Sequence, residues 1–284
     1  MAPNFISKLI LTLFLTIGLA ACSSLKILYN FADDYIKQEA TFFLNFDEQG
    51  MQDLTDKVDK MMKWHNTIML PHYAAYLNHQ ANQLELGLYN AQAVAKGMRD
   101  GLILIKNTIG GGAPYVASVL VHHTNSENIE HLRLQMLIRI KEKNETFEQP
   151  VDQRIENRKE RLKKNLKRFM GNLNEKQTKL INRYAKVTVN DARRRLTNRT
   201  LRQSALLTFL TAKPSEMEID TFVRQILLRP YEIVDPGYKV FSEERIDLLT
   251  ILLANILAAS TQDQRTATVY KLRSYAQDLV EISN

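Results

Sequence analysis

The sequence predicts an all-α protein, a multi-helix bundle with long, partly kinked amphipathic helices. The 284 residues include only 10 glycines and 7 prolines, and no stretch alternates apolar and polar residues for long enough to predict a strand. Hydrophobic residues make up 45% of the chain, which is typical of a protein with a packed core. Four residues that commonly cap helices are each followed three positions later by Glu or Gln, the pattern of a capping box: Asn45, Asn174, Ser215 and Thr261.

The first 21 residues have the layout of a secretory signal peptide. Lys8 precedes an uncharged, mostly apolar run over residues 9–21 that ends in small residues. This run is shorter than the roughly 20 residues that a membrane-spanning helix needs. Residues 19–22, Leu-Ala-Ala-Cys, resemble the lipobox of bacterial lipoproteins, in which the chain is cut before the cysteine and the cysteine is then acylated. The alternative is an ordinary signal peptide followed by an incidental cysteine.

The lipobox resemblance makes Cys22, the only cysteine, the predicted lipidation site. We therefore expect a lipoprotein signal peptide over 1–21, a lipidated tether over 22–26, and the membrane as a partner through the Cys22 lipid anchor. Ser23 and Ser24 stand where an aspartate would favour retention at the inner membrane. By resemblance to sorted lipoproteins, they indicate the outer membrane, with the protein facing the periplasm. Without a disulfide, the apolar core must hold the fold unaided.

Local signals divide the remainder into helices. Asn45 suits a helix start, and Pro71 and Pro114 suit first helical turns, where a missing N–H costs nothing. Three consecutive glycines, 110–112, predict a flexible joint near 109–113, and Pro150 should interrupt a long helix. Helices are expected over 27–43, 46–69, 71–108, 114–122, 126–148, 151–171, 175–211, 216–228, 243–259 and 262–282.

The last four of these helices follow capping residues. Asn174, Ser215 and Thr261 begin capping boxes, and Ser242 is followed by two glutamates that complement a helix N-terminus. A division near residue 111 or 172 would leave several amphipathic faces without a partner. We therefore predict a single all-helical domain over 27–284.

Positive charge is concentrated in one part of the chain. Residues 131–202 contain 21 Lys/Arg against 8 Asp/Glu, a net charge of +13, whereas the whole chain carries +7. An exported protein would meet an anionic envelope component or an unknown envelope protein, and no nucleic acid. The alternative is a solvated helical face beside an apolar stripe formed by Leu162, Leu166 and Phe169. The residues of this candidate basic interaction face are Lys159, Arg161, Lys163, Lys164, Lys167, Arg168, Arg193, Arg194 and Arg195.

Catalytic and metal-binding patterns are weak. His65, His72 and His79 are seven residues apart, which places successive side chains about 10 Å apart along a helix, too far to share one metal ion. No G-x-S-x-G, HExxH, CxxC or phosphate-binding loop accompanies them. We therefore expect no metal, no cofactor and no enzymatic activity.

The segment around the single tryptophan predicts a corner between two helices. Trp64 ends one expected helix and Pro71 begins the next, with His65 and Tyr73 nearby. These four residues form a candidate helix-corner groove with aromatic faces and one imidazole. The alternative is a packed corner, filled by Trp64 with Leu70 and Leu77.

Several segments together resemble an uncharacterised family of Gram-negative helical lipoproteins, a domain of unknown function. They are CSSLKILYN at 22–30, FDEQ at 46–49, W-H-x5-P-x-Y-A at 64–74 and RLKKNLKRFMGNLNEKQ at 161–177. The resemblance covers essentially the whole mature chain. It implies an envelope location and a helical architecture, and it transfers no activity.

Three hypotheses for function remain. The first is a non-enzymatic structural or adaptor role in the cell envelope, based on the anchor and the basic segment. The second is a helical periplasmic chaperone or envelope-stress sensor, because LNEKQ at 173–177 and STQDQ at 260–264 are similar to turns of such chaperones. Both are also plain capping boxes. The third is a cryptic hydrolase with no recognisable nucleophile.

Overall fold

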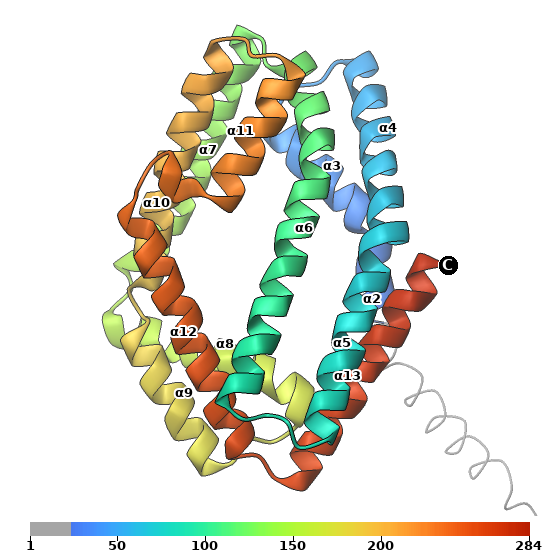
Figure 1. The fold of residues 1–284 in the computed structure, drawn as a ribbon. Coiled ribbons are helices and arrows are strands. Elements are labelled where there is room, and N and C mark those ends of the chain that lie inside the picture. The colour runs from blue at the N-terminus through green and yellow to red at the C-terminus, as the bar shows by residue number, and fades with distance from the viewer. Residues whose placement is uncertain (1–23) are drawn as a thin grey trace, which may run out of the picture.

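A computed structural model describes residues 24–284 (Figure 1). These residues form helices and no strands, which confirms the all-α, multi-helix class. The predicted signal peptide over 1–21 and the predicted lipidation site Cys22 lie outside the described residues. The helices are α2 (Ser24–Asn30), α3 (Ala32–Phe43), α4 (Glu48–Trp64), η1 (His65–Met69), α5 (Leu70–Glu85), α6 (Ala91–His123), α7 (Ser126–Glu148), α8 (Val151–Met170), α9 (Glu175–Val187), α10 (Asp191–Thr211), α11 (Glu216–Leu228), η2 (Pro230–Glu232), α12 (Gly237–Ala258) and α13 (Gln262–Ser283).

The helices surround a long central helix, α6 (Figure 1). On one side, α13 packs along α5, which continues the line of α4. At one end of the molecule α7, α10 and α11 gather near the C-terminal half of α6, while α8, α9 and α12 form the other end. Among residues 24–284, no helix combines the length and apolar character that a membrane span requires.

The core is divided into several local clusters. Ala117 of α6 and Ile219 of α11 belong to one cluster, which also includes residues of α7 and α10. Ile181 of α9 and Ile256 of α12 belong to a second cluster, against which Leu162 and Leu166 of α8 pack. The expected apolar stripe on α8 is therefore correct for these two leucines, and its third member, Phe169, packs edge-on against Tyr275 of α13. Two smaller clusters join α5 to α13.

The predicted corner at Trp64 and Pro71 does not occur. The chain stays helical from Glu48 to Glu85, and the five residues before Leu70 form a π-helical turn, η1. The backbone N–H of Leu70 donates to the carbonyl of His65, which gives the wider turn that defines a π-helix. A proline ring clashes with the preceding turn of a regular α-helix, and this wider turn lies directly before Pro71. The expected break is thus a bulge within one long rod.

The predicted joint near 109–113 is also wrong, because α6 runs through it without interruption. Gly110, Gly111 and Gly112 lie inside this helix, and so does Pro114, which the sequence placed at a helix start. Gly111 lies directly against the indole ring of Trp64, where a Cβ atom would overlap ring carbons. The glycine allows close approach of two helices, so its role is in packing.

The break missing from the predicted 71–108 helix lies at residues 86–90. Gly87 has a positive φ of 77° and ends α5. The N–H of Gly87 donates to Leu84 and that of Leu88 donates to Gln83, at 3.2 and 2.8 Å, which are the two bonds of a Schellman motif. Gly87 is the residue from which the sequence could have predicted this helix end.

Several expected helix boundaries hold and others shift. The capping boxes at Asn174, Ser215 and Thr261 are confirmed, and the chain breaks at Pro150 as predicted. Asp47 caps α4 in place of Asn45, since its side chain accepts from the N–H of Gly50. The predicted 27–43 helix divides at residue 31, and the predicted 175–211 helix divides at residues 188–190. The predicted 243–259 helix begins earlier, at residue 237, so Ser242 is an interior position and no cap.

Two turns at the same end of the molecule bind each other. Gln177 and Gln264, each the third residue of its helix and the last of its capping box, exchange two side-chain amide hydrogen bonds of 3.0 Å. The amide of Gln264 also donates to the carbonyl of Asn172, and that of Asn174 donates to Ala259. These bonds join the α8–α9 turn to the α12–α13 turn. LNEKQ and STQDQ each contribute one glutamine to this contact between turns.

Candidate anion-binding site

A cavity of about 750 Å³ lies between the C-terminal part of α7, helices α8 and α10, and the start of α12. Seven of its lining residues carry a positive charge and one carries a negative charge, Glu160. We call this space the arginine cavity. Its cationic residues are Lys143, Arg154, Arg158, Arg161, Arg195, Arg199 and Arg202.

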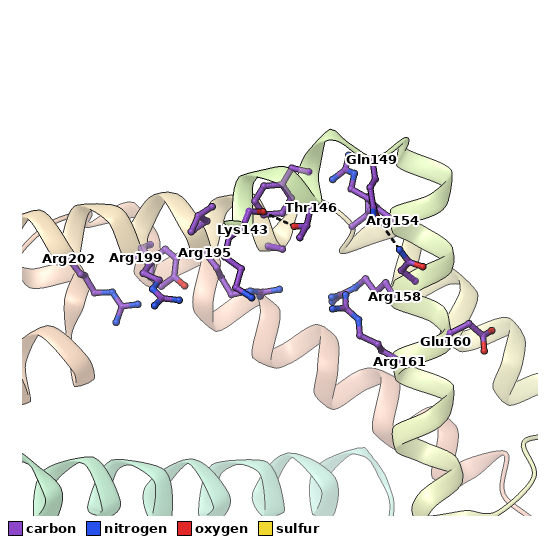
Figure 2. A pocket seen from close by; sticks show the side chains of 16 residues that line it. Lys143, Thr146, Gln149, Arg154, Arg158, Glu160, Arg161, Arg195, Arg199 and Arg202 are labelled. Atoms are coloured by element: carbon purple, nitrogen blue, oxygen red, sulfur yellow. Dashed lines mark hydrogen bonds between the residues drawn. The ribbon is translucent and has the colours of Figure 1, made fainter. Parts of the chain in front are cut away.

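Two helices supply six of these cations with the same spacing. Arg154, Arg158 and Arg161 occupy positions i, i+4 and i+7 of α8, and residues 195, 199 and 202 repeat the pattern on α10. This spacing places three side chains on one face of a helix. In Figure 2, the arginines of α10 point to one side of their helix, and Arg158 and Arg161 point toward them from α8.

The carboxylates near the cavity are already engaged. Glu160 accepts from Lys163 at 2.7 Å and points away from the arginines in Figure 2. Asp191 is buried and is shared by Arg245, at 3.1 Å, and Arg195, at 4.0 Å. Two further arginines donate hydrogen bonds to neutral side-chain oxygens: Arg158 to Thr188 at 2.6 Å, and Arg154 to Asn190 at 3.3 Å.

The remaining cations have no acidic partner. Within residues 24–284, no carboxylate forms an ion pair with Lys143, Arg161, Arg199 or Arg202. The Nε atoms of Arg154 and Arg202 are buried and donate to no acceptor in the structure. A buried donor without an acceptor costs free energy, and that cost is larger for a charged group. The cavity therefore offers more donors than the protein itself satisfies.

Burial and mutual repulsion act on these guanidinium groups. Burial is the main cause that lowers the pKa of Arg158, and the charges of Arg195 and Arg161 lower it further. Burial also lowers the pKa of Arg202, with a contribution from Arg199. Arginine nevertheless stays protonated in proteins. An anion in the cavity would relieve the repulsion and supply the missing acceptors.

Guanidinium chemistry indicates which anions would fit. Arginine presents its N–H groups in a planar fork that matches phosphate and carboxylate oxygens in pairs. Pockets that enclose small molecules commonly measure about 300–1,000 Å³, and this cavity lies in that range. Arginines from two helices line this space, so an anion there can be contacted from more than one side. Phosphate offers more acceptor oxygens than a carboxylate and is the simplest group to test.

A family model described as a family of unknown function, DUF6279, matches residues 43–239, more than half of the chain. The chain belongs to the DUF6279 family. All residues that line the arginine cavity lie within the matched region. No curated protein and no solved structure matches this chain.

The structure distributes the nine residues of the predicted basic face over different environments. Only Arg161 and Arg195 line the arginine cavity of this DUF6279 protein. Three others form ion pairs, Lys159 with Glu156, Lys163 with Glu160 and Arg194 with Asp235. Arg193 lies over the ring of Phe147, and Lys164, Lys167 and Arg168 are exposed.

Sequence reasoning missed five cations of the cavity. They lie inside the basic segment 131–202, but the predicted basic face consisted of residues from the densest runs of charge, and helical spacing was not considered. The repeated i, i+4, i+7 pattern on two predicted helices was the signal that could have found most of them. The missed residues are Lys143, Arg154, Arg158, Arg199 and Arg202.

The four residues of the predicted helix-corner groove contribute mainly to contacts between helices. The two ring nitrogens of His65 face the hydroxyls of Tyr29 and Tyr73, at 2.8 and 3.4 Å, and the Tyr73 hydroxyl also bonds to Thr108. Burial lowers the pKa of His65 and raises the pKa of Tyr29 to about 12. Trp64 packs against Gly111 of α6, and Pro71 is exposed.

The described residues contain no group of three or more His, Cys, Asp or Glu side chains arranged to hold a metal ion. His123 contacts Asp53, with 3.4 Å between the imidazole nitrogen and the carboxylate oxygen. Asp53 is also bound by Lys57 at 2.6 Å, so its charge is already paired.

Proposed function

We propose that this DUF6279 protein is a lipid-anchored protein of the outer membrane that faces the periplasm. Its helical domain binds an anionic component of the cell envelope in the arginine cavity, and its role is that of a structural or adaptor protein, without catalysis. One observation carries the binding part of this proposal. Seven cations line one cavity, whereas its single lining carboxylate is engaged by Lys163.

The lipobox at residues 19–22 supports the location. Helix α2 begins at Ser24, inside the predicted tether of 22–26 and two residues after the predicted lipidation site Cys22, so the tether is shorter than the sequence suggested. An acylated Cys22 would therefore hold the helical domain close to the membrane surface, because almost no tether separates the two. Anionic head groups are abundant at that surface, and basic segments are attracted to them.

Anion binding can be measured with inorganic phosphate as the probe. The thermal unfolding midpoint of the purified full-length protein is followed while phosphate replaces chloride at constant ionic strength. A ligand that binds only the folded state at 100 times its Kd adds about 2.7 kcal/mol to the free energy of unfolding. We expect phosphate to raise the midpoint of the wild type.

A pair of matched variants separates the cavity from general charge effects. Arg195→Gln/Arg199→Gln removes two cavity cations, and Lys164→Gln/Lys167→Gln removes two exposed cations of α8 that do not line the cavity. Because a hydrogen bond to a charged group contributes about 1.5–3 kcal/mol, the cavity variant should bind phosphate at least about tenfold more weakly. The lysine variant should respond like the wild type. Equal responses of both variants would show that phosphate acts on overall charge, and the proposal would fail.

A further inference from the structure

A second cavity, of about 390 Å³, adjoins the arginine cavity. It lies among α3, α4, α6, α7 and α10 and is lined almost entirely by apolar side chains, among them Ile36, Phe43, Val119 and Leu206. We call it the apolar cavity. Arg199 lines both cavities, so the two spaces meet at this residue of α10.

The face of α10 changes character along its length. Arg195, Arg199 and Arg202 line the arginine cavity, and Gln203 and Leu206 follow them in the apolar cavity. Figure 2 shows the three arginines in a row along this helix. One helix therefore presents cations first and apolar groups next. A ligand lying along it would need an anionic end and an apolar end.

Polar groups at the junction remain available to such a ligand. Lys57 also lines the apolar cavity, but its ammonium group is bound by Asp53 at 2.6 Å and by the carbonyl of Ser118 at 2.7 Å. In contrast, Arg199 has no acidic partner among the described residues. The Oε1 atom of Gln203 is buried and accepts no hydrogen bond in the structure. A donor and an acceptor thus stand free where the two cavities meet.

We infer that the ligand is an anionic glycerophospholipid, held with its phosphate among the arginines and one acyl chain in the apolar cavity. This inference rests on the proposed anion binding and identifies the class of anion. The arginines match the phosphate charge, and the buried Gln203 oxygen can accept a hydrogen bond from the free backbone hydroxyl of a lysophospholipid. The apolar cavity removes the chain from water, which favours binding in proportion to the apolar area that is buried.

Native mass spectrometry of the full-length protein in a neutral detergent tests this inference with three probes. Lysophosphatidylglycerol carries both an anionic head group and a chain. Glycerophosphoglycerol has the same head group without the chain, and lysophosphatidylcholine has a chain with a zwitterionic head group. We expect lysophosphatidylglycerol to bind at least about tenfold more tightly than glycerophosphoglycerol, because burial of a few methylene groups already gives that factor. It should also bind more tightly than lysophosphatidylcholine, because the zwitterionic head group has no net negative charge to match the arginines.

A variant that fills the apolar cavity gives a second readout. Ala40→Phe places a ring in the cavity, and Ala75→Phe adds the same ring at an exposed position of α5 as the control. In the Ala40→Phe variant, lysophosphatidylglycerol should bind no more tightly than glycerophosphoglycerol. The Ala75→Phe variant should keep the wild-type preference. The three-probe comparison on the wild type decides the question even if Ala40→Phe fails to fold.

The outcomes also separate this inference from the proposed function. Wild-type protein that binds phosphate and glycerophosphoglycerol but gains nothing from the chain would overturn the lipid inference and leave the arginine cavity as an anion site. Absence of binding by all three probes and by phosphate would overturn both. Equal binding of lysophosphatidylglycerol and lysophosphatidylcholine would show that the charge of the head group is not recognised, which also overturns the inference.

Discussion

Gly111 lies where the indole ring of Trp64 presses against α6. As part of a run of three glycines it predicted a flexible joint, yet the helix continues through all three. The three positions meet different surroundings. A Cβ atom at Gly111 would overlap the Trp64 ring, whereas one at Gly112 would have no neighbour within 4 Å. Of the three, only Gly111 needs to be a glycine for packing.

These neighbours form a matched pair for mutation. Alanine is favoured over glycine inside a helix by roughly 0.5–1 kcal/mol, so Gly112→Ala should raise the free energy of unfolding by about that amount. Gly111→Ala should lower the free energy of unfolding by about 1–3 kcal/mol, because overpacking forces the Trp64 ring to move. Urea denaturation measures both values. If Gly111→Ala were as stable as Gly112→Ala, the close packing of Trp64 on α6 would be incorrect.

At the scale of helices, two turns are joined by a pair of buried glutamines. Gln177 is fully buried and Gln264 is nearly so, and each completes a capping box while it also bonds to the other. A capping box satisfies local backbone groups at a helix start. Here the same side chains also connect segments 87 residues apart. The α8–α9 and α12–α13 turns should therefore lose stability together.

A double-mutant cycle measures this coupling. Gln177→Ala and Gln264→Ala should each lower the free energy of unfolding by about 1–3 kcal/mol, since each leaves a buried amide without its partner. Their combined effect should differ from the sum by about 0.5–3 kcal/mol, as is usual for residues in one network. Gln277→Ala, at an exposed position of α13, serves as the control and should change stability by less than about 0.5 kcal/mol. Additive effects of the two buried glutamines would argue against a shared network.

At the scale of the whole molecule, charge and anchoring act together. The segment over 131–202 carries +13 whereas the rest of the chain has a net charge of −6, so the electrostatic field of the protein is strongly asymmetric. The structure concentrates part of this positive charge inside one cavity. An anchor at Cys22 would keep the whole domain at a membrane, where anionic lipid head groups are available as ligands.

The anchor itself is tested by labelling cells with radioactive palmitate. The wild type and a Ser24→Ala control should incorporate the label, and Cys22→Ala should not. Acylation should then hold the protein at the membrane, because each buried CH₂ adds about 0.8 kcal/mol to membrane affinity and more than one acyl chain gives stable anchoring. Density-gradient fractionation of the envelope should place the labelled protein in the outer membrane. A wild type without label would contradict the lipoprotein hypothesis, and a labelled protein in the inner membrane would contradict only the sorting argument.

Much of the fold follows from local signals in the sequence. The capping boxes at Asn174, Ser215 and Thr261 and the break at Pro150 depend on neighbours within about one helical turn, and all four are present in the structure. The stripe of Leu162 and Leu166 likewise follows from helical periodicity. These features could be predicted because each is decided by contacts close in sequence.

The sequence by itself determined the helical class, several helix starts and the concentration of positive charge. Only the tertiary structure decided which charges meet. Arg161 and Arg195 line one cavity, whereas Lys164 and Lys167, in the same basic run as Arg161, face solvent. Tertiary packing likewise decided that Gly111 receives Trp64 and that Pro71 lies within a continuous rod. The physical reason is that a cavity or a close contact depends on residues that are distant in the chain, and local propensity carries no information about which distant surfaces will pack together.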